Sequence, residues 1–513
     1  MSEAQSAPQQ VLRLSQLLPD LSSAAAGISV SDVTLDSGSV QPGGLFLACP
    51  GRSTHGLQHV SEAIARGARA VLFEPQEALI APQLPAEIFV AAVAGLSRRV
   101  GDIADKFFDR PSARLSVTGI TGTNGKTTCA WLLANALERC GRPAGYMGTI
   151  GVGMTGASRS LSATKHTTSD AITVHRQLNE LLRAGAQCVA MEVSSHALDQ
   201  GRVAAVRFQV AAFTNLTRDH LDYHRSMHDY GAAKARLFEW PDLVSRVINV
   251  DDEFGVDLAV RYASTGRLIV TARKPAGVAA AQRFAATGAV ELFARNLRLD
   301  GLGMSCEIVV DGRQDHFRTS LVGDFNVDNV LTVLGMLLAL DVPRSQAIAA
   351  LGRCRAPPGR MEMFGGGTDP LVLVDYAHTP DALARALQAA RSHCAGRLRV
   401  VFGCGGDRDV GKRPLMALVA AQRADEIVLT DDNPRNEDPV RIVADIVAGL
   451  PPQCAHTIIH DRAKAIRELL RRSIAGDVVV IAGKGHEDYQ NYGNEKRPFS
   501  DQRVVREALG LSA

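Results

Sequence analysis

Short apolar and β-branched runs alternate along the chain with longer segments rich in Ala, Leu and Arg. A run of about 4–8 such residues is typical of a buried strand, and the longer segments are typical of helices that cover a sheet. The alternation therefore predicts an α/β fold with parallel sheets and helical crossovers. The predicted strands are residues 115–118, 188–193, 371–374, 399–402, 426–429 and 478–481.

The length of the chain indicates several domains. Its 513 residues exceed what one hydrophobic core usually supports. Breaks rich in Pro and Arg interrupt the periodic segments at FDRPSAR, around Pro111, and at RAPPGR, around Pro357 and Pro358. We therefore expect three domains after a loose N-terminal tail, namely 1–112, 113–355 and 356–513.

Composition narrows the ligand class and the compartment. The 56 Lys and Arg nearly balance the 54 Asp and Glu, which argues against a nucleic-acid binder or a membrane-surface protein and favours small-molecule ligands. The nine cysteines are scattered without a C-x-x-C pair, as reduced thiols are. No signal peptide is evident, and the apolar run 330–340 falls well short of the roughly 20 residues of a membrane helix. We expect a cytoplasmic protein in which this run is a core helix.

A glycine-rich turn between a predicted strand and a predicted helix indicates a phosphate site. The segment is GITGTNGKTT, residues 119–128, and it departs from strict Walker A spacing at Ile120. Helix N-terminal amides and close backbone approach suit an anion there. Lys126 would neutralise the β- and γ-phosphates, and Thr127 or Thr128 would offer a hydroxyl to Mg²⁺. The alternative is an ordinary strand-to-helix turn with a solvated lysine.

Two middle segments carry candidate metal ligands after apolar runs. Glu192 ends the run CVAME, and His220 lies in FTNLTRDHLDYH, which follows the run RFQVAAF. Mg²⁺ prefers oxygen ligands, so Glu192 fits best and His220 is a plausible additional ligand. Either residue alone could equally cap or pack a local element. By default Lys234, in GAAKARLF, is an exposed helix lysine.

Four apolar runs in the last third each end in a polar cluster. If these strands are parallel, the clusters meet at one edge of the sheet, where α/β proteins bind ligands. Arg408 and Arg435 would bind carboxylates, while Asp432 and Glu487 would pair with ammonium groups. The pattern predicts a small zwitterionic ligand with more than one charge of each sign.

Several of these motifs resemble the Mur ligase family. TGTNGKTT is similar to its ATP-binding signature, and related folylpolyglutamate synthases typically carry Gly-Ser after the lysine. DNPR (432–435), GCGGDRD, GKRPLM and GKGHE resemble, in order and spacing, the members that add diaminopimelate. The resemblance implies a small N-terminal α/β UDP-binding domain, a central P-loop ATPase-like domain and a C-terminal Rossmann-like domain.

The same resemblance implies an activity. It is the ATP-dependent addition of meso-diaminopimelate to UDP-N-acetylmuramoyl-L-alanyl-D-glutamate through an acyl phosphate, in peptidoglycan precursor synthesis. Mg²⁺ and a CO₂-derived carbamate on Lys234 are the implied cofactors. We expect a monomer with no nucleic-acid or membrane partner.

The resemblance also assigns residues. The catalytic set is Lys126, Lys234, His220 and Glu192, and the metal set is Thr127, Glu192, His220 and carbamylated Lys234. The ATP set is Gly122, Thr123, Asn124, Gly125, Lys126, Thr127, Thr128 and Asn326. The UDP-substrate set is Leu35, Ser37, Arg52, Ser53, Thr54, His166, Thr167, Thr168, Ser194, Gln200 and Arg202. The diaminopimelate set is Arg408, Asp432, Asn433, Pro434, Arg435, Gly483 and Glu487. Two positions depart from the family: His166 stands where relatives tend to carry Asn, and Gly38 where they commonly carry Arg.

Three alternatives stay open. A lysine-adding ligase conflicts with Arg435, because lysine has no second carboxylate. A folylpolyglutamate-type enzyme conflicts with the GKTT loop and the N-terminal module. A nucleotide-dependent switch protein would need the phosphate loop but no amino-acid pocket, and turnover to ADP and a new amide would distinguish it from a ligase.

Overall fold

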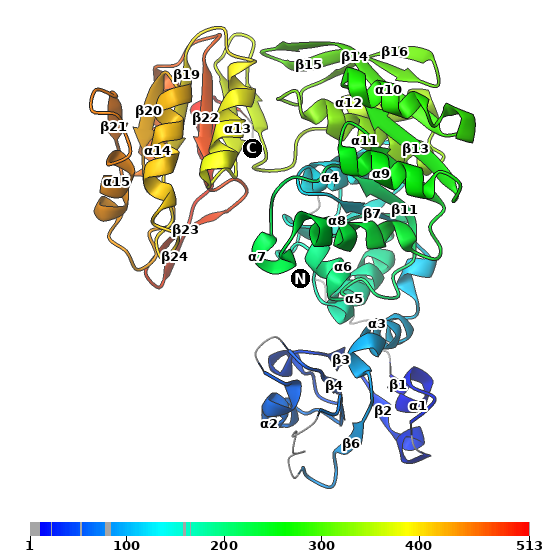
Figure 1. The fold of residues 1–513 in the computed structure, drawn as a ribbon. Helices are drawn as coiled ribbons and strands as arrows, with labels where there is room; N and C mark the ends of the chain where they lie inside the picture. Colours follow the sequence, from blue (N-terminus) through cyan, green and yellow to red (C-terminus); the bar gives the residue numbers. More distant parts are fainter. Residues whose placement is uncertain are drawn as a thin grey trace. The chain divides into compact units, whose positions relative to one another are not determined.

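The computed structural model describes residues 11–21, 23–51, 54–76, 84–156, 161–164 and 166–511. It falls into two compact units. Figure 1 labels the helices and strands of both. The first comprises Met1–Thr123, Gly141–Ala212 and Thr217–Ser245, and the second comprises Asn124–Cys140, Phe213–Leu216 and Arg246–Ala513. Each unit is described by itself.

The first unit begins with a small α/β layer. Its parallel sheet has the order β3-β4-β5-β6. On β4, Leu45 and Leu47 join one buried cluster and Phe46 and Ala48 join another, because successive side chains of a strand point to opposite faces. The sheet is therefore covered on both sides. The elements are β1 (Leu12–Arg13), α1 (Leu14–Leu17), β2 (Ser29–Val30), β3 (Val33–Thr34), β4 (Leu45–Ala48), α2 (Val60–Ala65), β5 (Ala70–Phe73), β6 (Phe89–Ala92) and α3 (Leu96–Phe107).

The rest of the first unit is built on strands in the order β11-β7-β10-β8-β9. β10 runs parallel to both β7 and β8, and Glu192 at the end of β10 is in register with Ile120 of β7. The carboxyl ends of these two strands therefore meet at one edge. The elements are β7 (Ser116–Thr121), β8 (Ala144–Gly148), β9 (Gly151–Met154), α5 (Ala171–Arg183), β10 (Cys188–Glu192), α6 (Ser195–Asp199), β11 (Phe208–Phe213), α7 (Leu221–His224) and α8 (Met227–Ala235).

The second unit contains strands in the order β12-β13-β14-β15-β16, of which the last three form an antiparallel meander. α11 is buried along almost its whole length, which confirms the prediction of a core helix at 330–340. The elements are α4 (Lys126–Arg139), β12 (Ser245–Asn249), α9 (Glu253–Tyr262), β13 (Arg267–Ala272), α10 (Pro275–Gln282), β14 (Val290–Asp300), β15 (Gly303–Val310), β16 (Arg313–Thr319), α11 (Asn326–Ala339) and α12 (Arg344–Gly352).

The C-terminal sheet of this unit has the order β17-β18-β22-β19-β20-β21. All its strands are parallel except the edge strand β17, so the predicted parallel arrangement of the four apolar runs is confirmed. α13, α14 and α15 pack on one face, and α16 and α17 on the other. The elements are β17 (Glu362–Gly365), β18 (Leu371–Asp375), α13 (Pro380–Arg391), β19 (Leu398–Phe402), α14 (Lys412–Arg423), β20 (Glu426–Leu429), α15 (Pro439–Val447), β21 (His456–Ile458), α16 (Arg462–Arg471), β22 (Val478–Ala482), β23 (Tyr489–Tyr492), β24 (Glu495–Pro498) and α17 (Asp501–Ala508).

Among the described residues, no helix combines the length and the apolar character that a membrane crossing requires.

Candidate functional site

The phosphate loop follows β7 directly. In the first unit, the Gly122 carbonyl accepts a hydrogen bond from Nζ of Lys234 at 2.8 Å. The Thr123 hydroxyl donates to the carbonyl of Thr217 at 3.2 Å and lies 3.2 Å from the hydroxyl of Tyr230. These contacts fix the start of the loop against α8 and the segment before α7.

In the second unit, the loop continues into the first turn of α4. The amide of Asn124 donates to Oδ1 of Asn215 at 3.0 Å, and its carbonyl accepts from the hydroxyl of Thr214. Gly125 has φ +86°, and a Cβ there would lie 2.4 Å from Oδ1 of Asn329, so this position requires glycine. The helix begins at Lys126, with Thr127 and Thr128 in its first turn. The amides at the N-terminus of a helix point outward and suit a phosphate anion.

Two asparagines lie in the first turn of α11. Asn326 donates to the carbonyl of Val322 at 2.8 Å and accepts from Nδ2 of Asn329 at 2.8 Å. Asn329 also accepts from the thiol of Cys129 in α4 at 3.4 Å. The structure therefore places Asn329, more than the predicted Asn326, against the loop and its helix.

The predicted metal ligand Glu192 is buried, with 1% of its surface exposed. Its Oε1 accepts from the hydroxyl of Tyr146 and from the amide of Thr149 at 2.9 Å, and its Oε2 accepts from the hydroxyl of Thr149 at 3.2 Å. These donors orient the carboxylate and carry no charge themselves. A buried, oriented carboxylate is a suitable ligand for a hard divalent cation.

Lys234 and His220 lie near one another through a shared aromatic neighbour. Lys234 is 1% exposed, and its Nζ lies 4.3 Å from the ring centroid of Tyr230. The ring of His220 lies 5.9 Å from the same ring and 5.0 Å from that of His196. The reading of Lys234 as an exposed helix lysine is therefore wrong. Its ammonium is held inside the first unit, beside the phosphate loop.

The predicted peptide-substrate residues form one connected group around Glu192. Thr168 donates to the main-chain carbonyl of Glu192 at 2.9 Å, and its hydroxyl accepts from the amide of Ser194 at 3.2 Å. Arg202 donates to the Thr168 carbonyl at 2.9 Å and to Oε1 of Gln200. A small cavity of about 10 Å³ is lined by residues that include His166, Thr167, Thr168 and Glu192.

The predicted UDP-sugar residues lie on the N-terminal layer of the first unit. The hydroxyl of Ser37 donates to Glu62 at 2.7 Å, the hydroxyl of Thr54 lies 3.3 Å from Nε2 of His59, and Leu35 packs against a core cluster. Arg52 and Ser53 lie outside the described residues. The UDP-sugar site therefore stays a prediction.

The four strand ends of the C-terminal sheet enclose a cavity of about 360 Å³. Its lining comes from the ends of β18, β19, β20 and β22, which confirms that the four polar clusters meet at one edge. Of the predicted diaminopimelate residues, the lining includes Arg408, Asp432, Asn433, Arg435, Gly483 and Glu487, and further lining residues include Tyr376, His378 and Lys412. Pro434 is not among them, and its carbonyl lies against Gly406.

Charges of both signs line this cavity. Arg408 is exposed, and Nη1 of Arg435 donates to the Gly406 carbonyl at 2.6 Å. Burial raises the pKa of the Asp432 carboxyl, and the nearby cations Arg462 and Lys484 lower it in opposition. The cavity can therefore receive carboxylates at its arginines and an ammonium at Asp432 and Glu487.

Sequence reasoning did not assign the residues that orient these groups. Tyr146 and Thr149 support Glu192, and no motif marks them. Asn215 supports the phosphate loop and stands in FTNLTRDHLDYH, the segment in which only His220 was chosen. Lys484 stands inside the GKGHE motif, and Asn329 stands three residues after Asn326. The only sequence signal for either residue was its position close to an assigned site residue, Asn326 or Glu487.

Comparison with known proteins agrees with this geometry. Residues 29–99 match the family described as "Mur ligase family, catalytic domain", residues 120–337 match "Mur ligase middle domain", and residues 359–485 match "Mur ligase, glutamate ligase domain". The three matches follow one another in chain order and contain most residues of the described sites, with Glu487 just beyond the last match.

Curated relatives and solved structures extend the agreement. The chain is 48% identical over 496 residues to a UDP-N-acetylmuramoyl-L-alanyl-D-glutamate--2,6-diaminopimelate ligase of Ectopseudomonas mendocina, covering 97% of this chain and 98% of the relative. It is 44% identical over 498 residues to the protein of the same name from Pseudomonas aeruginosa, again covering 97% and 98%.

A solved structure of a ligase of that name is 31% identical, with a TM-score of 0.70 over 98% of this chain and 99% of that chain. A crystal structure of MurF from Acinetobacter baumannii, 18% identical with a TM-score of 0.61 over 93% of this chain and 96% of that one, shares the fold. The chain belongs to the Mur ligase family.

Proposed function

We propose that this chain joins meso-diaminopimelate to UDP-N-acetylmuramoyl-L-alanyl-D-glutamate at the expense of ATP. The observation that carries the proposal is the cavity at the C-terminal strand ends. Its lining brings together three cations and three carboxylates, namely Arg408, Lys412 and Arg435 with Asp409, Asp432 and Glu487. Diaminopimelate carries two carboxylates and two amines, so its charges match that lining. The names of the 48% and 44% identical relatives support the same substrate.

The reaction that we propose proceeds through an acyl phosphate. The glutamyl carboxylate of the UDP substrate attacks the γ-phosphorus of ATP and ADP leaves; an amine of diaminopimelate then attacks the acyl carbon and phosphate leaves. Lys126 would neutralise charge on the transferring phosphoryl group, and the amides of the 122–128 loop would hold the phosphates. No covalent enzyme nucleophile is needed, because positioning and charge neutralisation supply the effect.

The residues present suit Mg²⁺. Buried Glu192 is an oriented oxygen ligand, and His220 and a modified Lys234 of the same unit would add ligands. The Thr127 hydroxyl is the further ligand that the resemblance implies. Mg²⁺ would neutralise charge on the phosphates of ATP. Reaction of the neutral Lys234 amine with CO₂ would release one proton and leave an anionic carbamate, which supplies oxygen ligands that an ammonium lacks.

Residues of the N-terminal and central regions would bind the UDP substrate and the adenosine. The UDP substrate would contact Leu35, Ser37, Arg52, Ser53 and Thr54 with its nucleotide sugar, and His166, Thr167, Thr168, Ser194, Gln200 and Arg202 with its peptide. Asn326 would lie near the adenosine. We further propose domains 1–112, 113–355 and 356–513 and a cytoplasmic location. The chain is proposed to be a monomer, and light scattering of the purified chain would test its oligomeric state.

Product analysis tests the proposed function directly. The chain, ATP, Mg²⁺ and the UDP-linked dipeptide are incubated with diaminopimelate or with lysine, and the products are weighed by mass spectrometry. We expect ADP and a UDP-linked tripeptide that contains diaminopimelate. Preferential addition of lysine would contradict the assignment of diaminopimelate as the substrate. Nucleotide binding with slow hydrolysis and no amide product would contradict the assignment as a ligase.

Arg435→Ala tests the basis of the substrate choice. We expect kcat/KM for diaminopimelate to fall about 10- to 150-fold, because a charge-assisted fork to the distal carboxylate is lost. Use of lysine should fall less, so the preference ratio narrows, while the KM values for ATP and the UDP substrate barely change. Steady-state kinetics with both amino acids measure the ratio.

The matched control is Arg441→Ala, which removes an exposed arginine from α15. It should leave all constants near the wild-type values. The control is needed because Arg435 also donates to Gly406, so its loss loosens the loop that carries Arg408. An unchanged diaminopimelate-to-lysine ratio would show that Arg435 does not determine the substrate.

A further inference from the structure

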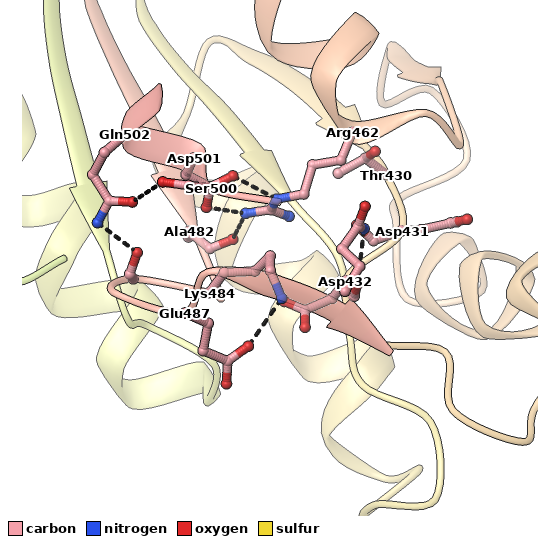
Figure 2. Close-up of polar contacts among 12 residues, drawn as sticks. Thr430, Asp431, Asp432, Arg462, Ala482, Lys484, Glu487, Ser500, Asp501 and Gln502 are labelled. Atoms are coloured by element: carbon pink, nitrogen blue, oxygen red, sulfur yellow. Dashed lines mark hydrogen bonds and ion pairs between the residues drawn. The ribbon is translucent and has the colours of Figure 1, made fainter. Parts of the chain in front are cut away.

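A buried lysine lies directly behind the C-terminal cavity. Lys484 follows β22, and its side chain is 0% exposed. Its Nζ donates to Oε2 of Glu487 at 2.9 Å and to Oδ1 of Asn433 at 3.1 Å. Figure 2 shows Lys484 directed at Glu487. Lys484 does not belong to the lining of the cavity, whereas both of its hydrogen-bond partners do.

The three side chains form a closed set of hydrogen bonds. Nδ2 of Asn433 donates to Oε2 of Glu487 at 2.8 Å, the same oxygen that Lys484 contacts. Oδ1 of Asn433 also accepts from the amide of Asn491 at 2.9 Å. Within the described part of the chain, no donor contacts Oε1 of Glu487. Two donors therefore fix one carboxylate oxygen and leave the other for a ligand.

The second buried cation nearby is already neutralised. Arg462 makes a two-pronged ion pair with Asp501, with both N–O distances 2.8 Å and both side chains 0% exposed. It also donates to the carbonyl of Ala482 at 3.0 Å, which anchors the end of β22 just before Gly483 (Figure 2). The Arg462–Asp501 pair therefore supports the backbone and contributes little net charge.

Lys484 acts on a second carboxylate besides Glu487, because its charge lowers the pKa of Asp432 against the effect of burial. Asp432 is 7% exposed, and Gly483 lets it approach, because a Cβ at Gly483 would lie 2.4 Å from Oδ2 of Asp432. With Arg462 paired to Asp501, the Lys484 cation is balanced against Asp432 and Glu487 together. The group is one positive charge short of neutrality, and the ammonium of an amino acid would supply that charge.

We propose that Lys484 is a positioning residue for the amino-acid substrate: it holds Glu487 and Asn433 so that Glu487 and Asp432 together receive the substrate ammonium. The inference rests on the proposed function and deepens it. Lys484 acts through Glu487 and does not touch the substrate. Burying a lysine is costly, and a residue needed only for packing would be replaceable by an apolar side chain of similar length.

The test is a double-mutant cycle on the full chain. Lys484→Met keeps the length of the side chain and removes the charge. We expect it to raise KM for diaminopimelate about 10- to 100-fold, because the carboxylate loses a charged hydrogen-bond partner. kcat and the KM values for ATP and the UDP substrate should stay within about twofold, since those sites are elsewhere. Lys464→Met, a 64% exposed lysine on α16, is the matched control and should change nothing.

The second arm of the cycle is Glu487→Gln. If Lys484 acts through Glu487, Lys484→Met should add at most about threefold to KM for diaminopimelate in the Glu487→Gln background. A lysine that only stabilises the fold would produce the same increase in both backgrounds, which would overturn the inference. An unchanged KM in folded Lys484→Met, or equal increases for all three substrates, would overturn it as well.

Folding is checked by thermal melting. If Lys484→Met does not fold, Lys484→Gln keeps a donor, and the cycle is repeated with it. Failure of both variants to fold would show a structural role and contradict the inference. A wild-type chain that ligates no diaminopimelate contradicts the proposed function, whereas an active wild type matched by Lys484→Met contradicts this inference alone.

Discussion

Replacement of Lys126 by alanine should lower ligation by at least about 10³-fold, equivalent to about 4 kcal/mol of transition-state stabilisation. Lys126 is the first residue of α4 and follows Gly125, which has φ +86°. At this place its ammonium would meet the phosphoryl group as charge shifts onto the leaving ADP. Such a preorganised charge acts mainly on the transition state, so kcat should fall more than ATP affinity.

The measurement is release of ADP together with formation of the amide product. Alanine is the best helix former, so the variant should fold normally, and its melting temperature should confirm this. Lys464→Ala, which removes an exposed lysine from α16, is the control for loss of a lysine as such. Near-normal turnover by a folded Lys126→Ala chain would contradict the phosphate-loop assignment.

The C-terminal cavity could be predicted well from the sequence because a single geometric rule places it. Parallel strands end at the same edge of a sheet, so four apolar runs followed by polar clusters were sufficient. The rule predicts which edge of the sheet carries the cavity, but it does not predict the contacts that support the lining residues. Arg462 and Asp501, 39 residues apart, pair across α16 and α17, and nothing in either local pattern indicates a buried charge.

The phosphate loop shows a similar division. Its turn and its lysine were readable locally, because glycines and a strand-to-helix transition have composition signals. The contacts that hold the loop in place could not be predicted. Thr214 bonds to Asn124 from 90 residues away, and Asn329 bonds to Cys129 from 200 residues away. Such contacts depend on how the elements pack, and a single sequence contains no direct record of packing.

Lys234 shows where local pattern misled. In GAAKARLF it resembles a surface lysine on a short Ala-rich helix, and only the resemblance to the Mur ligases indicated a special role. The structure buries it because α8 packs against α6 and because Tyr230, one helical turn earlier, covers the side chain. The predicted Arg52 and Ser53 of the N-terminal module fall outside the described residues, so their role in binding the UDP sugar stays a prediction.

Lys234→Ala should lower ligation about 10²- to 10³-fold, because the proposed carbamate oxygens would be lost from the metal site. The side chain is 1% exposed and its Nζ contacts the Gly122 carbonyl, so the amine lies at the start of the phosphate loop. An unmodified ammonium there would repel Mg²⁺, whereas a carbamate would attract it. The change should therefore affect kcat and the Mg²⁺ dependence more than KM for diaminopimelate.

Chemical rescue and CO₂ dependence separate the carbamate from a merely structural lysine. Acetate or formate can occupy the space that the side chain leaves and bring an oxygen ligand, so either should restore part of the activity of Lys234→Ala. The wild type should lose activity in CO₂-depleted buffer and regain it when bicarbonate is added, whereas Lys234→Ala should not respond to bicarbonate. Lys464→Ala should follow the wild type in every assay. Wild-type rates for Lys234→Ala in CO₂-depleted buffer would show that ligation requires neither a carbamate at this position nor the hydrogen bond from Lys234 to Gly122.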